Sequence, residues 1–267
     1  MRDFLSAQSF YMKKDLMFKS ISYLFIIAGI LLPIWMGNKV GFHFSNWLQP
    51  FTLVVPLSLF FYFIIPIYVS FFATEGFEYG SIKNIIASGC SRSKYISGKY
   101  ISIVKAIIGW IFLFFCLFYF VYVIGVLITG SSSLSNNQNL YRDMVTTFVG
   151  FGLNILYLAA YAAIILLLSI LFKRTASTVV ATFVFVFGDF LISGYFKDSL
   201  STFFLWLSNH SLTTQIMKFS GIYVSNSKHI VLENLSSYVP VIIIPIVLIL
   251  MSLSLTYAIF RQRDVQA

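Results

Sequence analysis

Charged side chains are scarce in this sequence. Only 10% of its 267 residues are Asp, Glu, Lys or Arg, against about a quarter in soluble domains. Hydrophobic residues make up 59% of the chain, and the mean hydropathy is +0.88. At this length a soluble fold would be one or two domains. The chain has too few charged residues to cover the water-facing surface of such a fold. The composition therefore predicts that the chain is embedded in a lipid bilayer.

Cysteine and histidine are also rare. Cys90 and Cys116 give no disulfide framework. His43, His210 and His229 all fall between apolar runs and lack the spacing of metal ligands. A membrane metalloprotease or a serine protease with a histidine inside a span is therefore not expected. We expect no catalytic residue and no metal site in this chain.

The sequence has no P-loop for ATP. A Gly-x-x-x-x-Gly-Lys-Ser/Thr stretch is absent, and Ser97-Gly98-Lys99-Tyr100 lacks both the upstream glycine and the final hydroxyl residue. We therefore expect that the chain is not an ATPase and that it holds no cofactor of its own. If ATP drives its activity, ATP and Mg²⁺ belong to a partner chain.

Long apolar runs are abundant, and six of them are long enough to cross a bilayer, which takes roughly 20 residues of helix. They are Ser20–Met36, Phe51–Ala73, Tyr100–Thr129, Val145–Phe172, Ala176–Ser193 and Tyr238–Phe260. The predicted fold class is therefore all-α: a polytopic membrane protein that forms a single transmembrane domain over residues 1–267.

The positive residues set the expected orientation. The net charge is +9, but the lysines and arginines lie in short clusters beside apolar runs. This arrangement indicates that they set the orientation of the spans in the membrane rather than bind nucleic acid. With the N-terminus inside, 13 of them lie on the cytoplasmic side and 5 on the other. The positive-inside rule therefore predicts that both termini are cytoplasmic.

The predicted outside segments are unequal. Gly37–Pro50 and Gly130–Met144 are loops, the second rich in Ser and Asn (Gly130-Ser131-Ser132-Ser133, Asn136-Asn137). Residues 194–237 are longer and contain Phe203-Phe204-Leu205-Trp206-Leu207, which is too short to span and too apolar for a solvated loop. We expect a re-entrant or interfacial hairpin there, with Phe203 and Trp206 as candidates for an outer gate.

Residues 1–19 have helical periodicity. Phe4, Ala7, Tyr11 and Phe18 recur at spacings of three, four and seven, and Lys13, Lys14 and Lys19 are available to lipid phosphates. This pattern predicts a helix that lies in the inner interface. The alternative is a disordered basic leader that serves only topology.

Residues 76–97 form the predicted inside loop between the second and third spans. Ser81 is placed to cap a short helix, Ile82, Ile85 and Ile86 share one face of it, and Gly89 is placed to end it. Such a helix suits a groove on a cytoplasmic partner, but the same face also suits the lipid surface. Periodicity alone leaves both open.

The same loop carries a resemblance to a family. The residues concerned are Glu78-Tyr79-Gly80-Ser81-Ile82-Lys83-Asn84, then Gly89, Ser91-Arg92 and Lys99. This order resembles the first cytoplasmic loop of bacterial type-2 ATP-binding-cassette exporter permeases. The leading helix, the six spans, the apolar hairpin and the tail with Arg261, Arg263 and Asp264 are similar to that family in layout.

The resemblance implies a coupling helix that contacts an ATPase subunit. Its docking surface would comprise Glu78, Ile82, Lys83, Ile85, Ile86 and Arg92. It also implies a second permease half, identical or homologous, and a place in the bacterial cytoplasmic membrane. Export of a peptide, toxin, antimicrobial or lipid, or immunity to one, would be the function.

Two polar residues inside the predicted spans are candidates for the pathway. Asp189 could carry protons or bind a cation, or it could pair locally near the outer end, for example with Lys197. Asn154 favours an interhelical hydrogen bond over a ligand contact. An ion-gradient-driven secondary transporter that uses Asp189 is therefore the alternative function, and a membrane scaffold or enzyme is the third.

Overall fold

The computed structural model describes residues 2–42, 49–129, 140–225, 228–229 and 235–262. Nearly all of these residues are helical, as predicted. The helices are α1 (Arg2–Lys14), α2 (Leu16–Val40), α3 (Gln49–Leu57), the 3₁₀ helix η1 (Ser58–Phe60), α4 (Phe61–Glu78), α5 (Ser81–Ala87), α6 (Arg92–Thr129), α7 (Leu140–Phe172), α8 (Thr175–Tyr195), α9 (Thr202–His210), α10 (Leu212–Phe219) and α11 (Leu235–Gln262). Two short antiparallel strands, β1 (Val224–Ser225) and β2 (Lys228–His229), precede α11.

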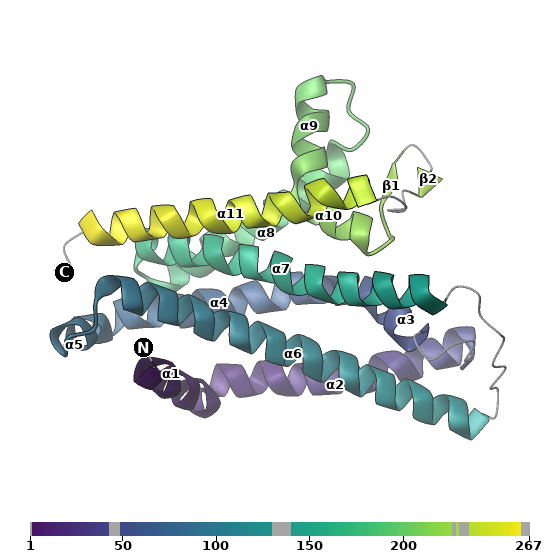
Figure 1. Cartoon of the computed structure of the whole chain (residues 1–267), viewed down its shortest axis with the longest axis horizontal. Helices are drawn as coiled ribbons and strands as arrows, with labels where there is room; N and C mark the ends of the chain where they lie inside the picture. The colour runs from purple at the N-terminus through teal and green to yellow at the C-terminus, as the bar shows by residue number, and fades with distance from the viewer. Residues whose placement is uncertain (1, 43–48, 130–139, 226–227, 230–234, 263–267) are drawn as a thin grey trace.

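The long helices run along the length of the molecule (Figure 1). Helix α1, helix α5 and the last turns of α11 lie at one end of this bundle, which we call the α5 end. Helices α9 and α10 and the two strands are displaced from it along the bundle. Helix α9 stands across the bundle rather than along it (Figure 1).

Five helices in the described part of the chain are long and apolar enough to cross a membrane. They cover Leu16–Lys39, Arg92–Thr129, Thr147–Phe172, Thr175–Tyr195 and Tyr238–Gln262. These helices coincide with five of the six predicted spans. The architecture is that of a multi-pass membrane protein.

The second predicted span, Phe51–Ala73, is not one helix. It is divided into α3, η1 and α4, and α4 continues beyond the predicted end to Glu78. The break lies between Pro56 and Pro66, each of which removes a helical hydrogen bond and crowds the preceding turn. A 3₁₀ segment within a helical run is typical of a hinge or of local strain.

Helical structure also extends further at the α5 end than predicted. Helix α6 begins at Arg92 rather than Tyr100, so the last residues of the expected 76–97 loop are helical. At the N-terminus the helix stops at Lys14. Asp15 then caps α2, because its carboxylate accepts from the backbone N–H groups of Met17 (3.0 Å) and Phe18 (3.4 Å).

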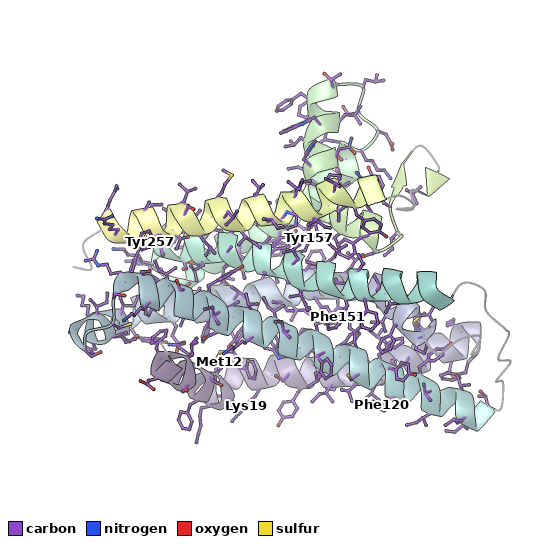
Figure 2. All side chains as sticks on the ribbon, in the orientation of Figure 1. Met12, Lys19, Phe120, Phe151, Tyr157 and Tyr257 are labelled. Carbon is purple, nitrogen blue, oxygen red and sulfur yellow. The ribbon has the colours of Figure 1, made fainter. Side chains whose placement is uncertain are left out.

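Helix α7 is central to the bundle. It packs against α4, α6, α8 and α11, and the alanines around Tyr161 allow those helices to come close. Figure 2 labels Phe151 and Tyr157 on α7. It also labels Phe120 of α6, whose side chain is exposed. The Tyr157 hydroxyl donates to the Val241 carbonyl of α11 (2.7 Å), which ties the two helices together.

Several predicted features lie outside the described residues. They are the Ser- and Asn-rich turn (Gly130–Ser133 and Asn136-Asn137), the tail residues Arg263 and Asp264, His43, and residues 226–227 and 230–234 of the hairpin.

Candidate functional site

Helix α5 sits at the end of the bundle between two sharp turns. Gly80 precedes it with φ of +67°, a conformation that favours glycine. Gly89 follows with φ of +93°, and the N–H groups of Gly89 and Cys90 bond to the carbonyls of Ile86 (3.0 Å) and Ile85 (3.3 Å). This is a Schellman ending, so Gly89 ends the helix as predicted. Ser81 does not cap α5: it is the first helical residue, and its hydroxyl donates back to the Gly76 carbonyl (3.5 Å).

The apolar face of α5 is turned into the protein. Ile82 is only 2% exposed, and Ile85 and Ile86 are half-buried against the core. A residue with so little exposure has no free surface for a partner. Ile82 therefore does not belong to an exposed docking surface, which corrects the prediction. The isoleucine spacing was interpreted as a free face, although the same spacing suits packing onto α4.

The exposed side of α5 is polar. Lys83, Asn84 and Ala87 are exposed, and Tyr79 just before the helix is 78% exposed. Of the residues expected to dock a partner, Lys83 is thus the one that α5 itself offers fully to solvent. These four residues are part of the exposed surface at this end, together with Ser81, Ser88 and Gly89.

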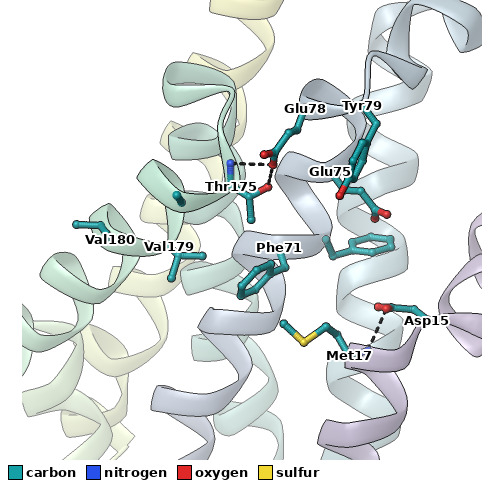
Figure 3. A pocket seen from close by; sticks show the side chains of 11 residues that line it. Asp15, Met17, Phe71, Glu75, Glu78, Tyr79, Thr175, Val179 and Val180 are labelled. Carbon is teal, nitrogen blue, oxygen red and sulfur yellow. Dashed lines mark hydrogen bonds between the residues drawn. The ribbon is translucent and has the colours of Figure 1, made fainter.

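Glu78 joins the end of α4 to the start of α8. Its Oε2 accepts from the Thr175 backbone N–H (3.1 Å) and also from the Thr175 hydroxyl. A carboxylate at a helix N-terminus is favourable because it meets the unpaired N–H groups and the positive end of the helix dipole. The structure therefore gives Glu78 a partner within the chain (Figure 3).

Arg92 joins the start of α6 to the end of α11. Its Nη1 donates to the carbonyls of Phe260 (3.0 Å) and Arg261 (3.1 Å), which are among those that a helix C-terminus leaves unpaired. The guanidinium also lies 5.9 Å from the centre of the Phe260 ring. The segment from Glu78 to Arg92, which contains α5, is thus tied at one edge to α8 and at the other to α11.

Helix α1 is held against the same region. The Phe4 ring packs on Tyr95 (centroids 5.8 Å apart) and directly over Gly98, where a Cβ atom would lie 2.5 Å from the ring. The Tyr11 hydroxyl donates to Glu75 on α4. Burial, together with this bond, raises the pKa of Tyr11 above its usual value, so the phenol stays a neutral donor.

Sequence reasoning missed Glu75, Asp15 and the Phe4–Gly98 contact. One signal was available for Glu75: Glu75 and Glu78 stand three residues apart at the end of an apolar run, in a chain with only nine acidic residues. Three residues is one helical turn, so both carboxylates lie on one side of α4. The partners that they reach lie on α1 and α8, and no sequence pattern identifies those.

Asp189 lies toward the other end of the bundle and holds α10. Its carboxylate accepts from the backbone N–H groups of Leu212 (3.2 Å) and Thr213 (2.7 Å), from the Thr213 hydroxyl (2.5 Å) and from the Tyr161 hydroxyl (3.1 Å). The expected local pairing therefore exists, but Lys197 is not the partner. Lys197 donates instead to the Val224 carbonyl (3.3 Å).

Asn154 is fully buried between α4 and α7. Its Oδ1 accepts from the Tyr62 hydroxyl (2.8 Å), and its Nδ2 donates to the Gly150 carbonyl one turn earlier (2.9 Å). This is the interhelical hydrogen bond that the sequence favoured.

Phe203 and Trp206 lie on α9 and are 63% and 57% exposed. Phe204 stacks on Phe196 (centroids 4.6 Å apart) and the Trp206 ring lies beside His210, so these aromatic side chains pack among themselves. Helix α10, in contrast, packs against α7, α8 and α11. Phe203 and Trp206 are thus not brought together with Asp189 or Asn154.

Comparisons of the chain with protein-family models, with curated proteins and with solved structures give no match. The described residues contain no group of three or more His, Cys, Asp or Glu that could hold a metal ion. At the α5 end, hydrogen bonds and packing link a short helix to the ends of several long ones.

Proposed function

We propose that this chain is the membrane subunit of an ATP-driven exporter, coupled to a separate ATPase subunit that binds ATP and Mg²⁺. One observation carries the proposal: α5 projects at the end of the bundle, and its flanks are bonded to α8 through Glu78 and to α11 through Arg92. A push on α5 therefore moves α4, α6, α8 and α11 together. Such a linkage is what a permease needs to convert closure of an ATPase into movement of its spans.

In this proposal the α5 end faces the cytoplasm, as the excess of lysine and arginine near that end favours. The broken run of α3, η1 and α4 makes the sixth crossing. A second copy of the chain, or a homologous one, completes the pathway within a bacterial plasma membrane. The 3₁₀ turn at Ser58–Phe60 gives the second span a point at which it can bend.

The cargo is hydrophobic or amphipathic: a peptide, a toxin, an antimicrobial or a lipid. The spanning helices present aliphatic and aromatic side chains with few charges, which suits apolar surface better than sugars or ions. Export of such a cargo and protection of the cell against it are two roles of the same movement.

The test is co-purification of the full chain with its native ATPase from the source organism. The informative variant is Lys83→Glu combined with Ala87→Glu, since both positions are exposed and neither contributes to the core. Charge reversal at a docking surface is expected to weaken binding of the ATPase about tenfold or more. ATP hydrolysis that responds to the chain should fall in parallel.

Lys39→Glu is the matched control, because Lys39 is an exposed lysine in the last turn of α2, away from α5. It should leave binding and hydrolysis unchanged. Absence of any co-purifying ATPase, or equal binding by the α5 variant and the control, would count against the proposal. Substitutions of Ile82 are unsuitable here, because they would disturb packing rather than docking.

A further inference from the structure

The end of α1 and the start of α2 carry three exposed lysines. Lys13 and Lys14 lie in the last turn of α1, and Lys19 lies in the first turn of α2. Figure 2 shows Lys19 at the edge of the bundle, beside the point where the two helices meet. We call residues 13–19 the α1–α2 joint and these three residues the joint lysines.

The joint lies where a membrane-spanning helix begins, since the first span covers Leu16–Lys39. Leu16, Tyr23 and Ile27 are 77%, 64% and 56% exposed, so they mark the side of α2 that faces lipid. Lys19 lies three residues after Leu16 and four before Tyr23, which places it on the same side. A lysine at this position extends its flexible stem along the apolar surface and brings its ammonium group to the level of the lipid phosphates.

The acidic residues near the joint are engaged with other groups. Asp15 lies within the joint, but its carboxylate accepts from two backbone N–H groups of α2. Glu75 on α4 accepts from the Tyr11 hydroxyl. Among the described residues no joint lysine forms an ion pair, and the Nζ of Lys14 lies 5.5 Å from the centre of the Phe10 ring. The charge of the joint lysines is thus available to a partner outside the chain.

The apolar side chains near the joint divide into a packed set and an exposed set. Phe4 and Phe18, which belong to the periodic pattern of residues 1–19, pack against aromatic rings of α6. They are therefore not available to lipid. The most exposed apolar side chains here are Phe10 and Leu16, which flank the first two joint lysines. Lysines between exposed apolar side chains are typical of a surface at the boundary of head groups and acyl chains.

We propose that the α1–α2 joint binds the head group of an anionic phospholipid. The ammonium groups of the joint lysines meet the phosphate oxygens in charge-assisted hydrogen bonds. Phe10 and Leu16 lie against the glycerol and the first methylene groups of the acyl chains. Each lysine near an anionic membrane surface strengthens the attraction about fivefold. A zwitterionic head group carries a cation of its own, which the lysines repel, so the joint prefers an anionic lipid.

An anionic lipid fits this surface better than nucleic acid or another protein chain does. The joint adjoins the lipid-facing side of α2, so a lipid reaches it without leaving the membrane. A nucleic acid needs a longer positive stripe, and the same surface on a second copy of the chain would bring like charges together.

Lipid binding at the joint goes beyond the proposed export function and does not depend on it, since neither ATP nor a second subunit takes part. It requires only that α2 crosses the membrane. In the orientation that the positive-inside rule favours, the joint lies in the cytoplasmic leaflet, which carries the negative surface potential.

The test measures lipid enrichment at the joint, with the full chain in nanodiscs and without any ATPase. A bimane fluorophore is attached at Ser20→Cys, an exposed position beside Lys19, in a chain that carries Cys90→Ser and Cys116→Ser. The probes are phosphatidylglycerol and phosphatidylcholine, each with a nitroxide near the head group that quenches the fluorophore on contact. The mole fraction of each lipid that halves the fluorescence gives its relative affinity. For the native joint this fraction should be about tenfold lower for phosphatidylglycerol.

Glutamine at the three joint lysines (Lys13→Gln, Lys14→Gln and Lys19→Gln together) should abolish the preference for phosphatidylglycerol, because the amide is polar but uncharged. Arginine at the same positions should retain the preference, which separates loss of charge from damage to the fold. The matched control removes three positive charges at exposed positions outside the joint and should keep the preference: Lys39→Gln, Lys94→Gln and Arg261→Gln together.

Equal quenching by the two lipids at the native joint would overturn the proposal. A preference that survives glutamine at the joint lysines would also overturn it, as would a preference that the control loses to the same extent, because the whole protein would then attract anionic lipid. Quenching by a nitroxide at Ser20→Cys of a second copy, in discs without labelled lipid, would show that another copy of the chain covers the joint instead.

Discussion

Replacement of Asp189 by alanine is expected to release α10 from the bundle. Four donors converge on this carboxylate, from Leu212, Thr213 (two bonds) and Tyr161, and all three partner residues are buried. Each buried donor left without an acceptor costs about 1–3 kcal/mol. The energies of hydrogen bonds that share one carboxylate are not additive. We therefore expect a total loss of about 3–5 kcal/mol of unfolding free energy.

The assay is thermal unfolding of the purified chain together with hydrogen exchange. A loss of this size corresponds to a Tm lower by about 10 °C for a chain of this length. Exchange should increase in α10 and remain unchanged in the α2–α6 pair, which packs elsewhere. Asp189→Asn keeps one acceptor oxygen and should cost about half as much. An unaltered Tm together with unaltered protection of α10 would refute this account.

The same two variants examine the alternative function. An ion-gradient-driven transporter needs an acid that exchanges its proton or ion during the cycle. If Asp189→Asn abolished proton-dependent flux and left stability and α10 protection intact, the secondary transporter would be favoured. If flux fell only in proportion to the folded fraction, Asp189 would be an anchor of α10.

Three further changes test the ties between helices. Arg92→Gln should cost about 1–2 kcal/mol, because it weakens two charged bonds to the end of α11, and should increase exchange in the last turn of that helix. Asn154→Leu should cost about 1 kcal/mol by leaving the Tyr62 hydroxyl without its acceptor, and a cycle with Tyr62→Phe should recover most of it in unfolding experiments. Gly98→Val should displace α1, because the new Cβ atom meets the Phe4 ring; faster proteolysis within α1 measures this, and Phe4→Ala in the same chain should restore protection.

The spans were predictable because the bilayer imposes a length and a composition on each of them. The run from Tyr238 to Phe260 illustrates this: its helix extends only a few residues beyond the predicted limits at either end. The division of Phe51–Ala73 was less predictable. Pro33 lies inside α2 without interrupting it, whereas the stretch with Pro56 and Pro66 is interrupted, so proline content alone does not locate a break.

The turns that bound α5 were predictable from the sequence, but the contacts of its side chains were not. The Gly80 and Gly89 turns follow from local chemistry, because a positive φ favours glycine. The side to which Ile82 points does not, since an apolar face at helical spacing is equally suited to lipid, to a partner and to the chain's own core. The partner of Asp189 likewise depends on how α10 folds back, which involves residues more than twenty positions away.

The bond between Glu78 and Thr175 bears directly on the proposed function. It ties the edge of the α5 segment to the first residue of α8. A movement of α5 that carries the end of α4 with it must therefore either move α8 as well or break this bond. In the first case the bond transmits the movement to α8, as the proposal requires, and in the second it opposes the movement.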